Sequence, residues 1–194
     1  LLERGAAVRH ADKQGVTPLF VAAQHNNGGC VELLVAAGAS IDRRGLRGRT
    51  PLYVAAEDGR CDAVDCMLRM VDVQHRATRE AIAALKQKEF LYTEGLAGRG
   101  QLAATDPDEE TLLKTRLRDA AVEQERLHAE LDRIDRTVDV TDDRGRSPLW
   151  AAVANRQVEV VKRLLEGRAD PDLPNTTGAA RPLLCLPCHT SLMC

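Results

Sequence analysis

The apolar residues of this chain follow a helical spacing in short blocks that recur along the sequence. Residues 17–23 (Thr-Pro-Leu-Phe-Val-Ala-Ala) return at 50–56 as Thr-Pro-Leu-Tyr-Val-Ala-Ala, and residues 147–152 (Ser-Pro-Leu-Trp-Ala-Ala) form a third copy. Thr and Ser are good helix N-caps, and Pro is tolerated at the first helical position because its missing N–H would have no partner there. Each block therefore predicts the start of a short helix.

A second helix is expected after the first in each copy. In the first copy, a polar break at 24–29 precedes residues 30–37, whose apolar side chains again recur at helical spacing. Gly38 is expected to end this helix, because a helix C-terminus favours a residue that tolerates positive φ. An extended segment then leads into a Gly-rich turn at 43–48. One unit is therefore helix, turn, helix and β-turn, and such units stack side by side.

These residues resemble ankyrin repeats, and the resemblance covers roughly half of the chain. The matching segments are 12–39, 48–68, 142–149, 158–165 and 169–171, and a worn fourth copy begins at 181–184. The chain departs from the family pattern at Val71, where the family has its terminating Gly, and at Gly167-Arg168, which reverses the usual order. The resemblance implies an all-α fold, an ankyrin-repeat solenoid of helix-turn-helix-β-turn units.

The segment 72–137 interrupts this pattern. No Gly or Pro occurs between 108 and 143, whereas a repeat needs a tight turn between its helices. Asp106-Pro107-Asp108-Glu109 supplies an N-cap, a first-position Pro and a capping-box Glu for a long helix. The stripe that follows has spacings of four and three residues, and it consists of Leu113, Leu117, Ala120, Gln124, Leu127, Leu131, Ile134 and Val138. Such a stripe is typical of a helix that packs against another helix, as in a coiled coil.

Upstream, residues 75–92 can form a partner helix, with Ala81, Ile82, Leu85 and Tyr92 on one side. Residues 93–105 read as a flexible loop around their glycines. We therefore favour a helical hairpin inserted in the stack. The alternative is two eroded repeats, since residues 115–121 retain a Thr-x-Leu-x-x-Ala-Ala skeleton.

The sequence thus predicts four parts. Residues 1–71 hold a partial ankyrin repeat and two further ones, and 72–137 form the helical insert. Residues 138–186 hold a C-terminal repeat and the start of another, and 187–194 form an irregular tail. The chain opens at Leu1 in the middle of a repeat, so we expect it to be a fragment.

Composition narrows the function classes. The 194 residues carry a net charge of −2 and contain no apolar run long enough for a membrane span. The chain has no overall excess of Lys and Arg of the kind that binds nucleic acid, so nucleic acid is not the expected partner. The cysteines at 30, 61 and 66 fall at semi-apolar helix positions, where free thiols pack as small hydrophobes. This usage favours an intracellular, cytoplasmic protein.

Catalytic motifs are missing from the sequence, so we expect no enzyme activity, no catalytic residues and no cofactor. There is no Gly-Lys-Ser/Thr phosphate loop, no His-Glu-x-x-His and no Gly-x-Ser-x-Gly. Residues 185–189 (Cys-Leu-Pro-Cys-His) formally match a haem-attachment motif and, with Cys194, could be written as a zinc cluster. Adjacent Cys188 and His189 are awkward joint zinc ligands, so we place these residues in the first helix of the fourth repeat and predict no metal site.

Binding of a partner protein is the expected function. In the ankyrin family the variable contacts lie at the hairpin tips and along the exposed side of the first helix. When these family positions are transferred to this sequence, the residues at the tips are Lys13, Gln14 and Val16; Leu46, Arg47 and Arg49; and Asp143, Arg144 and Arg146. The helix face comprises Gln24, His25, Glu57, Asp58, Ala154 and Asn155.

The second turn holds four arginines in seven residues, Arg43, Arg44, Arg47 and Arg49. This density predicts a partner with an acidic segment. The plainer alternative is a solvated turn in which arginine keeps the edge soluble. Two other functions stay open: binding of nucleic acid or another polyanion by the basic tips, and recruitment of substrate for a larger enzyme.

Overall fold

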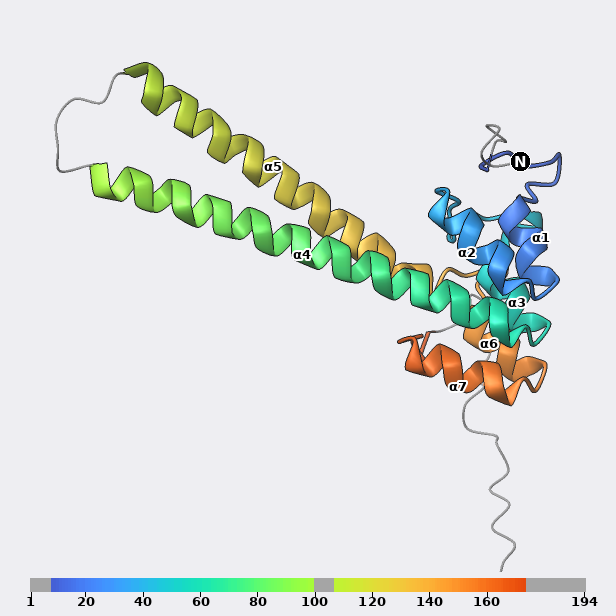
Figure 1. Cartoon of the computed structure of the whole chain (residues 1–194). Coiled ribbons are helices and arrows are strands. Elements are labelled where there is room, and N and C mark those ends of the chain that lie inside the picture. The colour runs from blue at the N-terminus through green and yellow to red at the C-terminus, as the bar shows by residue number, and fades with distance from the viewer. Residues whose placement is uncertain (1–7, 100–106, 174–194) are drawn as a thin grey trace, which may run out of the picture. The chain divides into compact units, whose positions relative to one another are not determined.

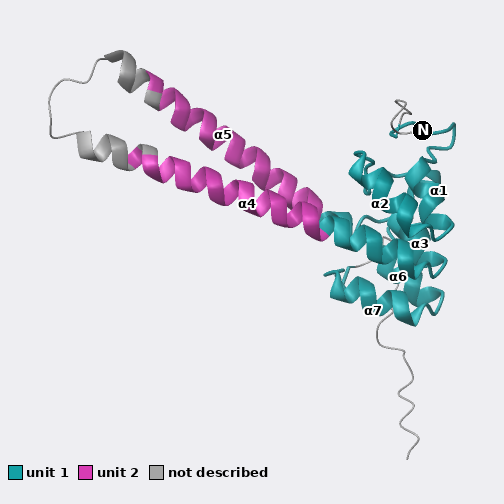
Figure 2. Ribbon diagram, viewed as in Figure 1, with its two compact units in different colours: residues 1–71, 136–194 teal, residues 72–135 magenta. Residues whose placement is uncertain are grey.

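The computed structural model describes residues 8–99 and 107–173, in which seven α-helices and no β-strand occur (Figure 1). The chain divides into two compact units (Figure 2). Unit 1 comprises residues 1–71 and 136–194, and unit 2 comprises residues 72–135. Residues 181–184, the Cys185–His189 motif and the tail 187–194 lie outside the described residues.

Three short helices in unit 1 begin where the sequence predicts. They are α1 (Pro18–Gln24), α3 (Pro51–Glu57) and α6 (Pro148–Ala154). Each begins with Pro, and the hydroxyl of the preceding Thr17, Thr50 or Ser147 accepts a 3.2 Å hydrogen bond from the backbone N–H three residues on. These hydroxyls therefore satisfy helix donors that would otherwise lack partners.

The second helices of the repeats follow in the predicted order. Helix α2 (Gly28–Ala36) packs on α1, and α7 (Val158–Glu166) packs on α6. Helix α4 (Cys61–Arg99) takes this place after α3. A 3-10 turn, η2 (Leu46–Gly48), lies before α3. Ankyrin-type helix pairs are thus present in the described residues, and the predicted all-α repeat solenoid is confirmed.

The core of unit 1 runs along the row α1, α3 and α6. Helix α3 packs against α1 on one side and against α6 on the other. The side chains that fill these contacts are small or aliphatic, and Leu19, Ala23, Leu52, Ala55, Ala56 and Ala152 have no exposed surface. Alanine at these positions lets the helices approach closely. The second and third sequence copies are therefore direct neighbours, although 72–135 separates them in the chain.

Helix α4 starts as the outer helix of the second repeat. Ala63, Val64 and Met67 are fully buried in unit 1, and the Asn26 side chain accepts a 3.1 Å hydrogen bond from the Ala63 N–H. The helix then continues through Val71 without a break. The family's terminating Gly is missing at this position, so no residue favours a left-handed C-terminus there.

The predicted loop at 93–105 is wrong for residues 93–99, which are helical. Isolated glycines cost a helix only about 1 kcal/mol each relative to Ala, and no Pro removes a backbone donor in this stretch. Residues 100–106 lie outside the described part of the chain.

The described residues of unit 2 belong to the distal part of α4 and to helix α5 (Pro107–Thr137), all but the last two residues of which lie in this unit. The two helices lie side by side (Figure 1). His75 Nε2 lies 3.0 Å from Asp135 Oδ1, and the Gln124 amide donates to the Glu89 carboxylate. These two contacts define an antiparallel register.

The side chains between the two helices follow the predicted stripe. Ile82 and Ile134 are buried, and Leu117, Ala120, Gln124, Leu127 and Leu131 are half-buried. The Leu113 side chain lies outside the description, and Val138 is buried in unit 1, after α5 ends.

Candidate functional site

Of the three hairpin turns before α1, α3 and α6, the first and the third share one frame. In the first turn, the Asp12 carboxylate accepts hydrogen bonds of 2.8 Å from the N–H groups of Gln14 and Val16. In the third turn, Asp142 accepts bonds of 2.9 Å from the N–H groups of Arg144 and Arg146. An Asx turn of this kind fixes the backbone, so the tip side chains project from a defined loop.

The second turn lacks this carboxylate, because Gly45 stands at the Asp position. Its ends are joined by a 2.8 Å hydrogen bond from the Gly45 N–H to the Arg49 carbonyl. Arg47 at its tip has a left-handed backbone with φ of 59°. This conformation is uncommon outside glycine, and it gives the Arg47 side chain a different direction from its counterparts in the other turns.

The second and third turns touch each other. The Asp143 N–H donates a 3.3 Å hydrogen bond to the Arg47 carbonyl. Gly48 has φ of 70°, and a Cβ at this position would overlap the Asp143 carboxylate and lie 2.8 Å from the Asp143 nitrogen. Only glycine fits here, and the two tips form one continuous surface.

Most of the predicted binding residues are exposed in the structure. Those with exposed side chains are Lys13, Gln14, Gln24, His25, Leu46, Arg47, Asp58, Asp143, Arg144, Ala154 and Asn155. Val16 is half-buried and packs against the core cluster of Phe20, Tyr53, Val54 and Ala151. Glu57, Arg49 and Arg146 are half-buried as well.

Arg49 and Arg146 have partners within the chain. Arg49 Nη1 donates a 2.7 Å hydrogen bond to Glu57 Oε2, and its guanidinium lies 5.4 Å from the centre of the Tyr53 ring. Arg146 donates to the Asp142 carboxylate from Nε at 2.9 Å and from Nη2 at 2.6 Å. The Arg146 guanidinium also lies 5.8 Å from the Tyr53 ring and 5.0 Å from the Trp150 ring. We call Arg49, Tyr53, Arg146 and Trp150 the Arg–aromatic cluster.

The electrostatics of this cluster follow from its burial. Two effects act on the pKa of Asp142 in opposite directions. Burial raises it, whereas hydrogen bonds from the Arg146 side chain and from the N–H groups of Arg146 and Arg144 lower it by a larger amount. The pKa of Asp142 therefore lies below its ordinary value. The Asp142 partner raises the pKa of Arg146. Burial raises the pKa of Tyr53 to about 12. The Asp142–Arg146 pair is therefore charged and fixed at neutral pH.

Sequence reasoning did not assign Tyr53 and Trp150 to this site. The available signal is the spacing, since Arg49 and Arg146 each stand four residues before an aromatic residue. In the first copy the same positions hold Val16 and Phe20. The cation–aromatic contacts therefore belong to the second and third repeats.

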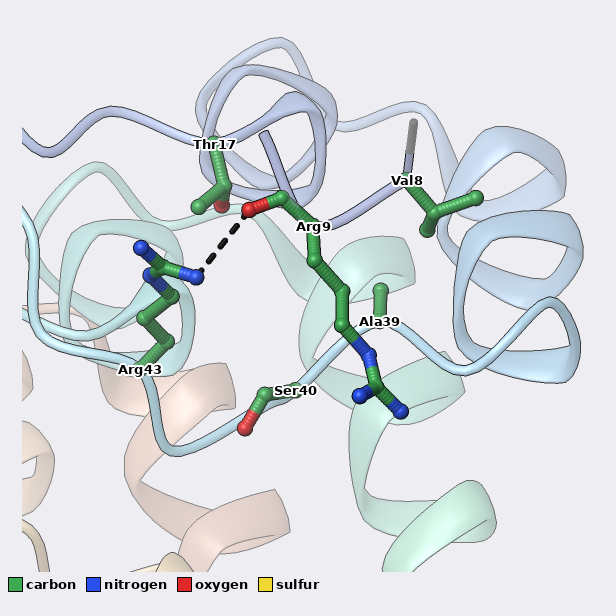
Figure 3. Close-up of a pocket in the computed structure, with 6 residues that line it drawn as sticks. All are labelled: Val8, Arg9, Thr17, Ala39, Ser40 and Arg43. Atoms are coloured by element: carbon green, nitrogen blue, oxygen red, sulfur yellow. Dashed lines mark hydrogen bonds between the residues drawn. The ribbon is translucent and has the colours of Figure 1, made fainter. Parts of the chain in front are cut away.

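A small cavity lies between the chain before the first turn and the loop after α2 (Figure 3). Its volume of about 30 Å³ holds one or two water molecules. Arg43 Nη1 donates a 3.0 Å hydrogen bond to the Arg9 carbonyl across it, and Arg9 Nε donates one of 3.1 Å to the Gly38 carbonyl. These bonds tie the chain before the first turn to the loop after α2, and the cavity is too small for a metabolite.

Residues 8–99 and 107–173 contain neither a candidate metal site nor a candidate membrane span. In these ranges no group of three or more His, Cys, Asp and Glu side chains could hold a metal ion. No helix there is long and apolar enough to cross a membrane. The three cysteines in this part of the chain are free thiols, of which Cys30 is exposed and Cys66 is buried.

Comparison with known protein families gives two matches. A family model for ankyrin repeats in three copies matches residues 1–77, and a model for a single ankyrin repeat matches residues 144–176. Together the two matches cover more than half of the chain. No curated protein matched the chain.

Proposed function

Because the chain belongs to the ankyrin-repeat family, whose repeats generally mediate protein–protein interactions, we propose that it binds an acidic segment of a partner protein through its second and third turns. The repeats would act as a non-catalytic module. The observation that carries the proposal is the exposed positive charge of the second turn.

This charge belongs to Arg43, Arg44 and Arg47, whose side chains are exposed. Arg49 is paired with Glu57, so its charge is already compensated within the chain. Exposed guanidinium groups bind carboxylates through two parallel hydrogen bonds, and this geometry favours acidic peptides. The second turn therefore offers the strongest contacts.

The third turn and the helix face would complete the contact. Asp143 and Arg144 lie at the tip that touches the second turn, so a bound segment could pass from one tip to the next. Further along, Gln24, His25, Asp58 and Asn155 offer polar contacts. The half-buried Trp150 adds an aromatic surface of the kind that often dominates binding energy.

The test measures binding of a fluorescent Glu-rich peptide to the whole chain by anisotropy. The variant combines Arg44→Glu and Arg47→Glu. Glutamate, like arginine, is not branched at Cβ, so it adds no strain to the left-handed backbone at position 47. We expect the dissociation constant to rise about tenfold or more, because two attractive contacts become repulsive. The melting temperature should stay close to that of the parent.

A matched control places the same charge change on exposed arginines of α4, as Arg76→Glu with Arg79→Glu. This variant should bind the peptide as the parent does. An equal loss of peptide affinity in both variants would mean that the change in net charge alone weakens binding, and this result would contradict the proposal. Tighter binding of an RNA homopolymer than of the peptide, with a steep salt dependence, would favour the polyanion alternative instead.

A further inference from the structure

Helix α4 has an apolar row on the side that faces away from α5. The row consists of Val73, Ala77, Ala84 and Leu91, all exposed in unit 2. At 100° per residue these four positions lie within an arc of about 40°, on the opposite side of the helix from Ile82, which is buried against α5. We call this row the outer seam of α4.

The outer seam leaves large apolar side chains in solvent. Val73 is 53% exposed and Leu91 is 61% exposed. Single exposed apolar residues are common, but a line of them at helical spacing on one face is typical of a surface that another helix covers. A hairpin of two helices buries one seam of each, and no described residue of unit 2 buries the four residues of the outer seam.

We propose that a second copy of this chain covers the outer seam, with the two α4 helices antiparallel and a two-fold axis at Ala84. A two-fold axis places residues equally far before and after Ala84 at the same level of the pair. Ala77 and Leu91 are each seven residues from Ala84, so a small side chain meets a large one twice. Ala84 meets its own copy, and its small side chain lets the helices approach closely.

The charges that border the seam fit the same register. Glu80 and Lys88 each lie four residues from Ala84, and both side chains are exposed. On the wheel they stand about 40° to either side of Ala84, at the margins of the contact. The two-fold arrangement therefore sets Glu80 beside the second copy's Lys88, and the reverse pair forms at the other end. A parallel pair would instead place each charge beside its own copy, so these charges favour the antiparallel arrangement.

The first test measures the mass of the whole chain by analytical ultracentrifugation over a range of concentrations. We expect a monomer–dimer equilibrium. Glu80→Lys alone, and Lys88→Glu alone, should each raise the dimer dissociation constant about tenfold, because two pairs per dimer become like-charged. The double variant Glu80→Lys with Lys88→Glu should restore the parent value. Glu125→Lys, at an exposed position of α5, is the matched control and should leave the dimer unchanged.

The second test locates the axis. Under mild oxidation, Ala84→Cys should form a disulfide between copies, identified by mass spectrometry of the linked peptides. Ala129→Cys, at an exposed position of α5, should not. A monomeric mass at every concentration would overturn the proposal. A dimer that Glu80→Lys leaves intact, or one that the double variant fails to restore, would overturn it as well.

Discussion

Asp142 and Asp12 occupy the same place in two turns but differ in what holds them. Both carboxylates accept hydrogen bonds from two backbone N–H groups. Asp142 is buried and also accepts two bonds from the Arg146 guanidinium, whereas Asp12 is exposed. Removal of Asp142 therefore leaves a half-buried cation without its carboxylate, and removal of Asp12 leaves groups that water can reach.

We expect Asp142→Ala to lower the free energy of unfolding by about 2 kcal/mol at pH 7, and Asp12→Ala by less than about 1 kcal/mol. Urea denaturation of both variants measures this difference. The pKa of Asp142 is lowered in the folded protein, so its stabilisation is present above an unfolded-state value of about 3.9 and is lost as the pH falls through the folded value. The parent should lose this stability in acid and Asp142→Ala should not. Equal costs for the two variants at pH 7 would contradict the assignment.

Tyr53 gives a second prediction, in alkali. Its ring is fully buried, and its hydroxyl has no hydrogen-bond partner among the described residues. Tyr53→Phe should therefore change the free energy of unfolding by less than about 1 kcal/mol at pH 7. Burial raises the pKa of Tyr53 from 10.0 to about 12, so the folded state keeps a proton that the unfolded state loses between these values.

Stability of the parent should accordingly fall as the pH rises from 10 to 12, and Tyr53→Phe should fall less. Guanidinium titrations at several pH values measure this slope. Val122→Ala, at an exposed position of α5 that carries no titrating group, is the control and should keep the parent's slope. Identical slopes in the parent and Tyr53→Phe would show that the Tyr53 hydroxyl is accessible to water.

Among the elements, the short helices α1, α3 and α6 could be predicted because their signals are local. The cap, the first-position Pro and the Ala pair lie within seven residues of each other, so no distant contact is needed to place them. The end of α4 could not be predicted in this way. The glycines of 93–99 favour a loop in the sequence pattern. The helix nevertheless continues through this stretch, because the free-energy cost of a glycine in a helix is small.

The candidate surface shows the same division. The exposed tips Lys13, Arg47 and Arg144 could be predicted, because their places follow from the repeat pattern. The partners of Arg49 and Arg146 could not. Glu57 stands eight residues after Arg49, and the Tyr53 ring meets Arg146 only because α3 packs against α6. A count of arginines therefore overestimates the charge that the turns present to a ligand.

At the scale of the whole molecule, the stack does not depend on chain continuity between its repeats. Leu52, Ala55 and Ala56 of α3 and Ala152 of α6 are buried in unit 1, and all lie outside 72–135. Asp139 accepts hydrogen bonds of 3.0 and 3.2 Å from the Asp170 N–H within the same unit. In a solenoid each repeat is stabilised by its neighbours in space, so a long insertion between neighbours costs little beyond loop closure.

Replacement of residues 72–135 by a Gly/Ser linker should therefore leave a folded stack. We expect cooperative thermal unfolding, and hydrogen-exchange protection of α1, α3 and α6 like that of the parent. The variant should still bind the Glu-rich peptide, because the arginines of the second turn remain, and it should be monomeric, because the outer seam of α4 is removed. Truncation after Gln157 is the control, since it removes the buried Val160 and Leu164 of α7 and should abolish cooperative unfolding. A linker variant that is unfolded while the parent is stable would mean that the hairpin, and not the contact of α3 with α6, holds the second and third repeats together.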